Sequence, residues 1–412
     1  MVMHRGGQAQ DGGEPSAPSG DYQAVPGYRV VFGNGSLERT GEILDAMGAR
    51  RCLVLTSPTL ARVSGVLPQV QGLLGPRCAG TFAGVSQRAP IDQAIAAVAE
   101  VRRLEADTLV SLGGTSVSDA SRVISMCIAE GIRDADGLRQ FHAAYERSGK
   151  LSLDPKRLLR QLFVPTTLSA GEFNVAGSIL DDAHKKKLGF VDHRIVPDAI
   201  ILDGRATIDT PAWLWLSTGI KALDHAIERL YDQGHNPLVD ACALSATALL
   251  FRHLPLCKRD AGNAAARLQC LLGAWLSMHG TPNVRLGLSH AIGHVLGVEF
   301  GILHGITACV TQPYTMEFNR PVSAGKQAMF AKAAGVDIGG MTDEEAAIAG
   351  AREVDRLIAE LGLPHRLREV HVPAAELPRL AELIVQDVNA NKWNAIPVSR
   401  PEQVLRVLES AW

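Results

Sequence analysis

TLVSLGGTSVSDASRVISMCIA, residues 108–129, is the stretch that decides the fold. It opens with Thr108–Leu112, a short apolar run typical of a buried strand, and two glycines follow directly. Ala120–Ala129 then has the composition of a helix, which Ser116 or Ser118 is placed to cap. A strand that turns on glycines into a helix predicts one unit of a parallel α/β sheet.

The same alternation continues on both sides of this stretch. Arg51–Thr56 reads as a buried strand, and helical patterns follow over Leu60–Leu74 and Ile91–Leu104. Leu162–Val164 and Ala199–Leu202 are further strand candidates. Repeated strands and helices of this kind predict a parallel sheet with right-handed crossovers.

The character of the chain changes near Thr210. Val239–Phe251, Ala264–Met278 and Glu344–Leu361 are long, rich in alanine and leucine, and free of internal proline, so they predict helices. We therefore expect an α/β domain over residues 21–205, an all-helical domain over residues 206–412, and a disordered tail at residues 1–20.

The composition excludes several classes of partner. A net charge of -2 over 412 residues gives no basic surface for nucleic acid or an anionic membrane. No apolar run is long enough for a transmembrane helix. The 7 cysteines are scattered without a C-x-x-C pair, which favours free thiols in a reducing compartment. We expect a cytoplasmic protein without disulfides.

The glycine turn has a possible ligand. Gly113 and Gly114 let the backbone approach a pyrophosphate, and the amides at the start of the following helix attract its charge. The turn matches neither the G-x-G-x-x-G fingerprint nor a Walker loop. From the local sequence alone, an ordinary tight connection explains it equally well.

A group of histidines is the strongest functional signal. Gly287–Gly305 reads GLSHAIGHVLGVEFGILHG, so His290 and His294 share one helical face and His304 follows a glycine-bearing turn. Lys221 and His225 are likewise one turn apart on another helix. Imidazoles at this spacing bind divalent metals or transfer protons, although a lone histidine is usually a buried hydrogen-bonding group. Their number in two apolar helices favours a functional cluster.

Together these segments resemble the iron-containing alcohol dehydrogenases, and among them the maleylacetate reductase branch. The histidine stretch resembles their G-x-x-H-x-x-x-H-x-x-G…H-G segment, and PTTLSAGE at residues 165–172 resembles their PTT…SE turn. GGTSVSDASR and TGIKALDHAIERLYD resemble two further motifs of the family. The resemblance implies a dehydroquinate synthase-like fold, a cleft between the domains for nicotinamide and substrate, and a homodimer.

The resemblance also implies a metal site with one ligand missing. Members that hold iron or zinc use one aspartate and three histidines, which here are His225, His290 and His304, while Lys221 stands at the aspartate position. An ammonium has no lone pair to donate and adds a positive charge, so we expect no bound metal. The alternative is a replacement ligand, Asp224 or Asp192, although Asp224 points about 100° around its helix from His225.

The cofactor implied by the resemblance is NADPH or NADH. Gly113, Gly114, Ser116 and Asp119 would flank the pyrophosphate, Thr166 and Thr167 the nicotinamide ribose, and Lys187 a ribose hydroxyl. Ser57 stands where NAD-preferring members carry an acidic residue, so nothing there would repel a 2′-phosphate. Thr115 replaces a glycine of the turn, and we expect it to crowd the pyrophosphate.

We expect a reductase that transfers hydride to a small anionic oxo or enoyl acid such as maleylacetate. Lys221, helped by protonated His225 or His290, would stabilise the developing negative charge, with His294 as the proton donor. Two alternatives stay open: a metal-dependent alcohol or aldehyde dehydrogenase, and a family member that has lost redox activity and binds a ligand or catalyses an elimination. Residues 133–156 look like an insertion at the substrate entrance or at an oligomer contact.

Overall fold

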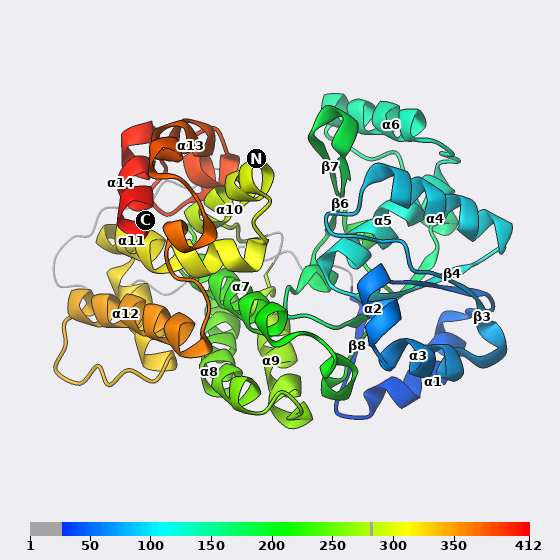
Figure 1. Cartoon of the computed structure of the whole chain (residues 1–412), viewed down its shortest axis with the longest axis horizontal. Helices are drawn as coiled ribbons and strands as arrows, with labels where there is room; N and C mark the ends of the chain where they lie inside the picture. The colour runs from blue at the N-terminus through cyan, green and yellow to red at the C-terminus, as the bar shows by residue number, and fades with distance from the viewer. Residues whose placement is uncertain (1–26, 281–282) are drawn as a thin grey trace.

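The computed structural model describes residues 27–280 and 283–412, so the predicted tail at residues 1–20 lies outside the described residues. Figure 1 shows two parts side by side: a sheet flanked by helices, formed by the first half of the chain, and a group of helices formed by the second half. This confirms the predicted fold class, an α/β domain followed by a helical one.

A parallel sheet forms the centre of the first domain. Its strands run in the order β1-β8-β5-β4-β2-β3. Their bounds are β1 Arg29–Phe32, β2 Cys52–Leu55, β3 Cys78–Phe82, β4 Thr108–Gly113, β5 Arg160–Pro165 and β8 Ala199–Leu202. The sequence predicted β2, β4, β5 and β8, which are buried along most of their length. It missed the two edge strands, whose partly exposed residues carry a weaker apolar signal.

Helices cover both faces of the sheet because its residues alternate in direction. Leu53 and Leu55 pack toward α4 and α5, whereas Cys52 and Val54 pack toward α1 and α3. The helices run as follows: α1 Thr40–Met47, α2 Pro58–Val63, α3 Val66–Leu74, α4 Ile91–Arg103 and α5 Thr115–Ala129. The single helix predicted over residues 60–74 is two helices, because the Asp209 carboxylate binds Ser64 Oγ and the Gly65 amide where they meet.

The β4–α5 connection is tighter than predicted. Helix α5 begins at Thr115, directly after Gly114, and not at Ala120. Neither serine caps it: Ser118 Oγ donates to the Thr115 carbonyl, while Ser116 Oγ accepts from the Arg88 amide. The amides of the first turn of α5 therefore keep no side-chain cap.

The order of the strands places two loops side by side. The connection after β2 leads outward to β3, and the connection after β4 leads in the opposite direction to β5. The carboxyl ends of β2 and β4 are adjacent where the order reverses, and in open parallel sheets this is where ligands bind. Ser57 follows β2 there, and Gly113 ends β4.

Residues 133–156 fold onto an antiparallel hairpin. They contribute α6 (Ala135–Ser148), and the hairpin consists of β6 (Ala176–Asp181) and β7 (Lys186–Val191). The Phe190 ring on β7 lies 5.1 Å from the ring of His142 on α6. In Figure 1, α6 lies beside β7 at the edge of the α/β domain.

Eight α-helices form the second domain over the described residues beyond Thr210. Their bounds are α7 Ala212–Leu230, α8 Pro237–Arg259, α9 Ala264–Ser277, α10 Leu288–Phe300, α11 His304–Ala333, α12 Asp343–Leu361, α13 Leu377–Ile384 and α14 Pro401–Ala411. Its main core joins α7, α8, α9, α11 and α12, and reaches Phe163 and Ile200 of the sheet. A Cβ on Gly305 would come within 2.7 Å of the Ser217 carbonyl oxygen, so α11 starts directly against α7.

All seven cysteines are free thiols, as predicted, and five of them are buried. No helix among the described residues is both long and apolar enough to cross a membrane.

Candidate active site

The four predicted histidines meet although they come from three helices. His225 lies on α7, His290 and His294 on α10, and His304 begins α11. Ring centroids lie 5.0 Å apart for His225 and His290, 5.1 Å for His290 and His304, and 5.5 Å for His294 and His304. The rings therefore form one continuous row.

Two glycines make this row possible. Gly301 ends α10 with φ 69°, a left-handed conformation that glycine adopts readily, and so lets the chain turn back to His304. A Cβ on Gly293 would lie 2.6 Å from the His304 ring. The sequence signal of histidines separated by glycines is thus explained by close packing of α11 on α10.

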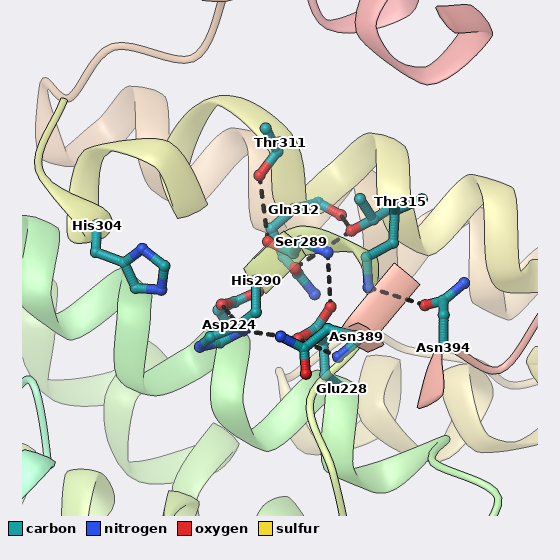
Figure 2. Close-up of polar contacts among 12 residues, drawn as sticks. Asp224, Glu228, Ser289, His290, His304, Thr311, Gln312, Thr315, Asn389 and Asn394 are labelled. Carbon is teal, nitrogen blue, oxygen red and sulfur yellow. Dashed lines mark hydrogen bonds and ion pairs between the residues drawn. The ribbon is translucent and has the colours of Figure 1, made fainter. Parts of the chain in front are cut away.

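His290 is held between two carboxylates (Figure 2). Its Nδ1 lies 2.7 Å from Glu228 Oε2 and 3.0 Å from Asp224 Oδ2, and all three residues are buried. Burial opposes the charged ring, but the two carboxylates outweigh it and raise the pKa of His290 to about 9. His290 is therefore an imidazolium at neutral pH.

Glu228 was missed by the sequence analysis. Its carboxylate accepts hydrogen bonds from the Gly287 amide at 2.9 Å and the Ser289 amide at 2.8 Å. It thus satisfies the start of α10, where a carboxylate also pairs well with the helix dipole. Its spacing of one turn from Asp224 on α7 was the signal that could have found it.

Lys221 is half-buried and belongs to the same cluster. Burial and the nearby Lys187 ammonium lower its pKa to about 8, while Asp224 and Asp119 act in the opposite direction. The Lys221 charge in turn lowers the pKa values of His225 and His304, so its ammonium acts on the histidine row.

The histidines beside Lys221 are neutral. Burial, then the charges of His290 and Lys221, hold the pKa of His225 well below its usual value. Burial and Lys221 do the same for His304. Of the two histidines expected to help Lys221, His290 is therefore the one that carries the charge, since an imidazolium at His225 would lie against it.

His294 lies at the rim of the cluster, with 43% of its side chain exposed. Its Nδ1 lies 2.8 Å from Asp387 Oδ2, a partner that the sequence analysis also missed. Although part of the side chain is exposed, desolvation of the ring lowers the pKa of His294 and outweighs Asp387, which raises it. A neutral ring that donates Nδ1–H to Asp387 has a bare Nε2, so it must take up a proton before it can donate one.

The glycine turn leaves no room for side chains. A Cβ on Gly113 would lie 2.7 Å from Val117 Cγ2, and one on Gly114 would lie 2.9 Å from Thr167 Oγ1. The uncapped amides of α5 face this turn, which fits a bound pyrophosphate. Ser57, beside it, accepts a hydrogen bond from the Leu60 amide and so caps α2.

The other predicted cofactor residues lie around this turn with different exposure. Thr166 and Thr167 are buried, and Thr167 Oγ1 pairs with Ser169 Oγ at 2.8 Å. Asp119 faces the hairpin, where it accepts from Ser178 Oγ at 2.8 Å, and burial raises its pKa. Lys187 is exposed on β7.

The Thr115 side chain is directed toward Gly171. A Cβ added to Gly171 would lie 2.6 Å from Thr115 Oγ1, a buried atom with no hydrogen-bond partner among the described residues. The expected crowding of a pyrophosphate by Thr115 stays a prediction.

The cluster fits a divalent metal poorly. Donor atoms of Asp224, Glu228 and His290 lie within 4.8 Å of one another, but both carboxylates already bind the His290 imidazolium. Lys221 adds a positive charge beside them. Of the two replacement ligands considered, Asp224 is close to the cluster because α10 brings His290 to it. Asp192 binds Arg194 instead.

Three buried atoms of the cluster have no hydrogen-bond partner in the described part of the chain: Asp224 Oδ1, His225 Nδ1 and His290 Nε2. Unpaired buried polar atoms are rare in proteins, and they are expected where a bound molecule or water completes the hydrogen bonds.

Comparisons with known proteins agree with this arrangement. The family model described as iron-containing alcohol dehydrogenase matches residues 27–204, and the C-terminal model of the same family matches residues 215–412. The maleylacetate reductase of Sphingobium indicum is 30% identical over 300 residues, covering 73% of this chain and 75% of that protein. The chain belongs to the iron-containing alcohol dehydrogenase family.

Other members of the family are similar over almost the whole chain. The NAD-dependent methanol dehydrogenase of Bacillus methanolicus is 28% identical over 87% of this chain and 92% of its own. The crystal structure of maleylacetate reductase from Agrobacterium tumefaciens superposes with a TM-score of 0.78 at 25% identity, covering 96% of this chain and 99% of that one. As a member of this family, the protein is an NAD(P)-dependent oxidoreductase.

Proposed function

We propose that this family member is a metal-independent reductase of small carboxylated oxo or enoyl acids, of the maleylacetate type. The observation that carries the proposal is Lys221, whose ammonium stands beside the histidine row where metal-holding members need an anionic ligand. The similarity to maleylacetate reductases supports the same choice of substrate.

NADPH or NADH would bind at the adjoining ends of β2 and β4. The tight Gly113–Gly114 turn and the uncapped start of α5 suit its pyrophosphate, and Ser57 offers no carboxylate to repel a 2′-phosphate. When bound, the reduced nicotinamide supplies a hydride to an electron-poor carbon of the acid, and the acid also gains one proton.

The side chains of the chain provide charge and the proton. Lys221 and the His290 imidazolium stabilise the negative charge that develops on the acceptor oxygen. A pKa of about 8 also makes Lys221 a suitable proton donor near neutrality. His294 can fill that role only after it is itself protonated.

The test is the oxidation of NADPH and NADH by metal-analysed, chelator-treated protein, with maleylacetate as the acceptor. We expect turnover at an unchanged rate after the metal is removed. Turnover that returns only with added iron or zinc would instead show a metal-dependent alcohol or aldehyde dehydrogenase, in which His225, His290 and His304 bind the metal. Failure to bind either cofactor would favour a member that has lost redox activity.

Assembly is a further expectation. We propose a homodimer, as the family resemblance implies, and light scattering of the purified protein would check it.

A further inference from the structure

Arg88 connects the two domains at the proposed site. It lies exposed in the loop between β3 and α4, and its amide donates to Ser116 Oγ in the first turn of α5 at 3.1 Å. Its guanidinium donates to the Gly297 carbonyl of α10. One residue therefore touches both the proposed cofactor turn and the helix that carries His290 and His294.

The guanidinium contacts the C-terminal end of α10, the helix that carries His290 and His294. His290, His294 and Gly297 follow one another at spacings of four and three residues, so they share one helical face. Gly297 lies about 4.5 Å beyond His294 along the helix axis, and about 10 Å beyond His290. Gly301 ends α10, and a Cβ there would lie 3.7 Å from Arg88 Nη2. The exposed cation thus lies beside the last turn of α10, next to a glycine that adds no side chain there.

The backbone around Arg88 is strained. Arg88 has φ 66° and Ala89 has φ 49°, both in the left-handed region that side chains disfavour. Two such residues in succession are unfavourable, and they persist only where the surroundings hold them. Here the buried Ala89 accepts a hydrogen bond from the Leu180 amide at 3.1 Å. The loop holds Arg88 in place by this anchor and by Ser116.

Arg88 has no carboxylate partner among the described residues, and its guanidinium binds only a carbonyl at the negative end of the α10 dipole. Arg122 and Arg194, also in the α/β domain, pair with Asp119 and Asp192, but no carboxylate pairs with Arg88 within residues 27–280 and 283–412. A carbonyl oxygen is a weak partner for a guanidinium, which presents five donors and binds carboxylates through two parallel hydrogen bonds. A carboxylate from outside the chain would therefore displace Gly297.

We propose that Arg88 binds a second carboxylate of the substrate, remote from the reacting carbon. The enzyme would then select dicarboxylic over monocarboxylic acids, with Lys221 and His290 at one end and Arg88 at the other. This inference rests on the proposed function, because it places the reacting end of the acid at Lys221.

The test compares binding of adipate and hexanoate, which differ by one carboxylate, in the presence of NADP⁺ by calorimetry. We expect the wild type to bind adipate about 10- to 100-fold more tightly, as charge-assisted hydrogen bonds of this kind provide. Arg88→Gln removes this preference, Arg88→Lys restores part of it, and Arg406→Gln, on the surface of α14, leaves it unchanged. Equal binding of the two acids by the wild type, or a preference that survives in Arg88→Gln, would overturn the inference.

Kinetics then separate this inference from the proposed function. With maleylacetate, Arg88→Gln should raise KM for the acid about 10- to 100-fold and leave KM for NADPH unchanged. A raised KM for NADPH alone would assign Arg88 to the cofactor and overturn the inference. A wild type that prefers adipate through Arg88 but does not reduce maleylacetate would refute the proposed function and leave the inference standing.

Discussion

Loss of the Lys221 proton should switch the enzyme off in mildly alkaline solution. The proposed role of Lys221 needs its ammonium form, and its pKa is lowered to about 8 by burial and by Lys187. An exposed lysine titrates near 10.4, so an alkaline limit near 8 is a distinctive signature. At pH 9 roughly one tenth of the enzyme would keep the charge, and kcat/KM should fall about tenfold for each further pH unit.

The loss of activity on removing the Lys221 ammonium depends on how much that charge stabilises the developing oxyanion. One charged donor aimed at a developing oxyanion contributes about 3–4 kcal/mol, so Lys221→Met should lower kcat by roughly two to three decades at pH 7. Lys221→Arg keeps the charge far beyond pH 10, because a guanidinium does not titrate there. The activity of Lys221→Arg should be lower than that of the wild type because the side chain has a different shape. It should, however, stay constant above pH 8, where the activity of the wild type falls.

The assay is the initial rate of NADPH oxidation from pH 6 to 10, with circular dichroism to confirm that each variant is folded. A limb near pH 8 that persists in Lys221→Arg would assign the titration to another group. Full activity in Lys221→Met would refute the catalytic role outright.

Three further results are expected. Gly114→Ala forces a Cβ to within 2.9 Å of Thr167 Oγ1 and should weaken NADPH binding about tenfold by fluorescence titration; Gly72→Ala, with open space around it on α3, should leave binding unchanged. Glu228→Gln leaves the His290 imidazolium with fewer anionic partners, so urea unfolding should show a loss of about 3–5 kcal/mol, against less than about 1 kcal/mol for Glu344→Gln in a surface pair. The raised pKa of His290, about 9, means that its stabilising effect is complete below pH 6.5 and is lost as pH rises through 9. The free energy of unfolding should therefore fall between pH 6.5 and about 9, and His290→Gln should remove that slope.

The parts of the fold predictable from sequence were those with a repeating signal. Buried strands such as β4 are apolar throughout, and the glycines after it can only be a turn. The histidine row was also predictable, because Gly293 and Gly301 indicate the close packing that brings His304 back to α10.

The missing parts of the site are charged residues from elsewhere in the chain. Asp387 lies 93 residues from His294, and Glu228 lies 59 residues from the amide that it binds. A charged residue is predicted to be exposed unless its partner is known. The periodicity of apolar residues therefore cannot show which charged side chains are buried. The break between α2 and α3 was missed for the same reason, since it depends on Asp209 from a distant loop.

The grip of Glu228 on the first amides of α10 also affects how the protein is made. Both contacts are between groups of the chain itself, so the start of the helix that carries His290 and His294 is held by a carboxylate of the protein. Under the proposed metal-independent function, cultures grown in iron-poor medium should yield as much heat-resistant protein as cultures grown in rich medium, and storage in air should not lower its stability.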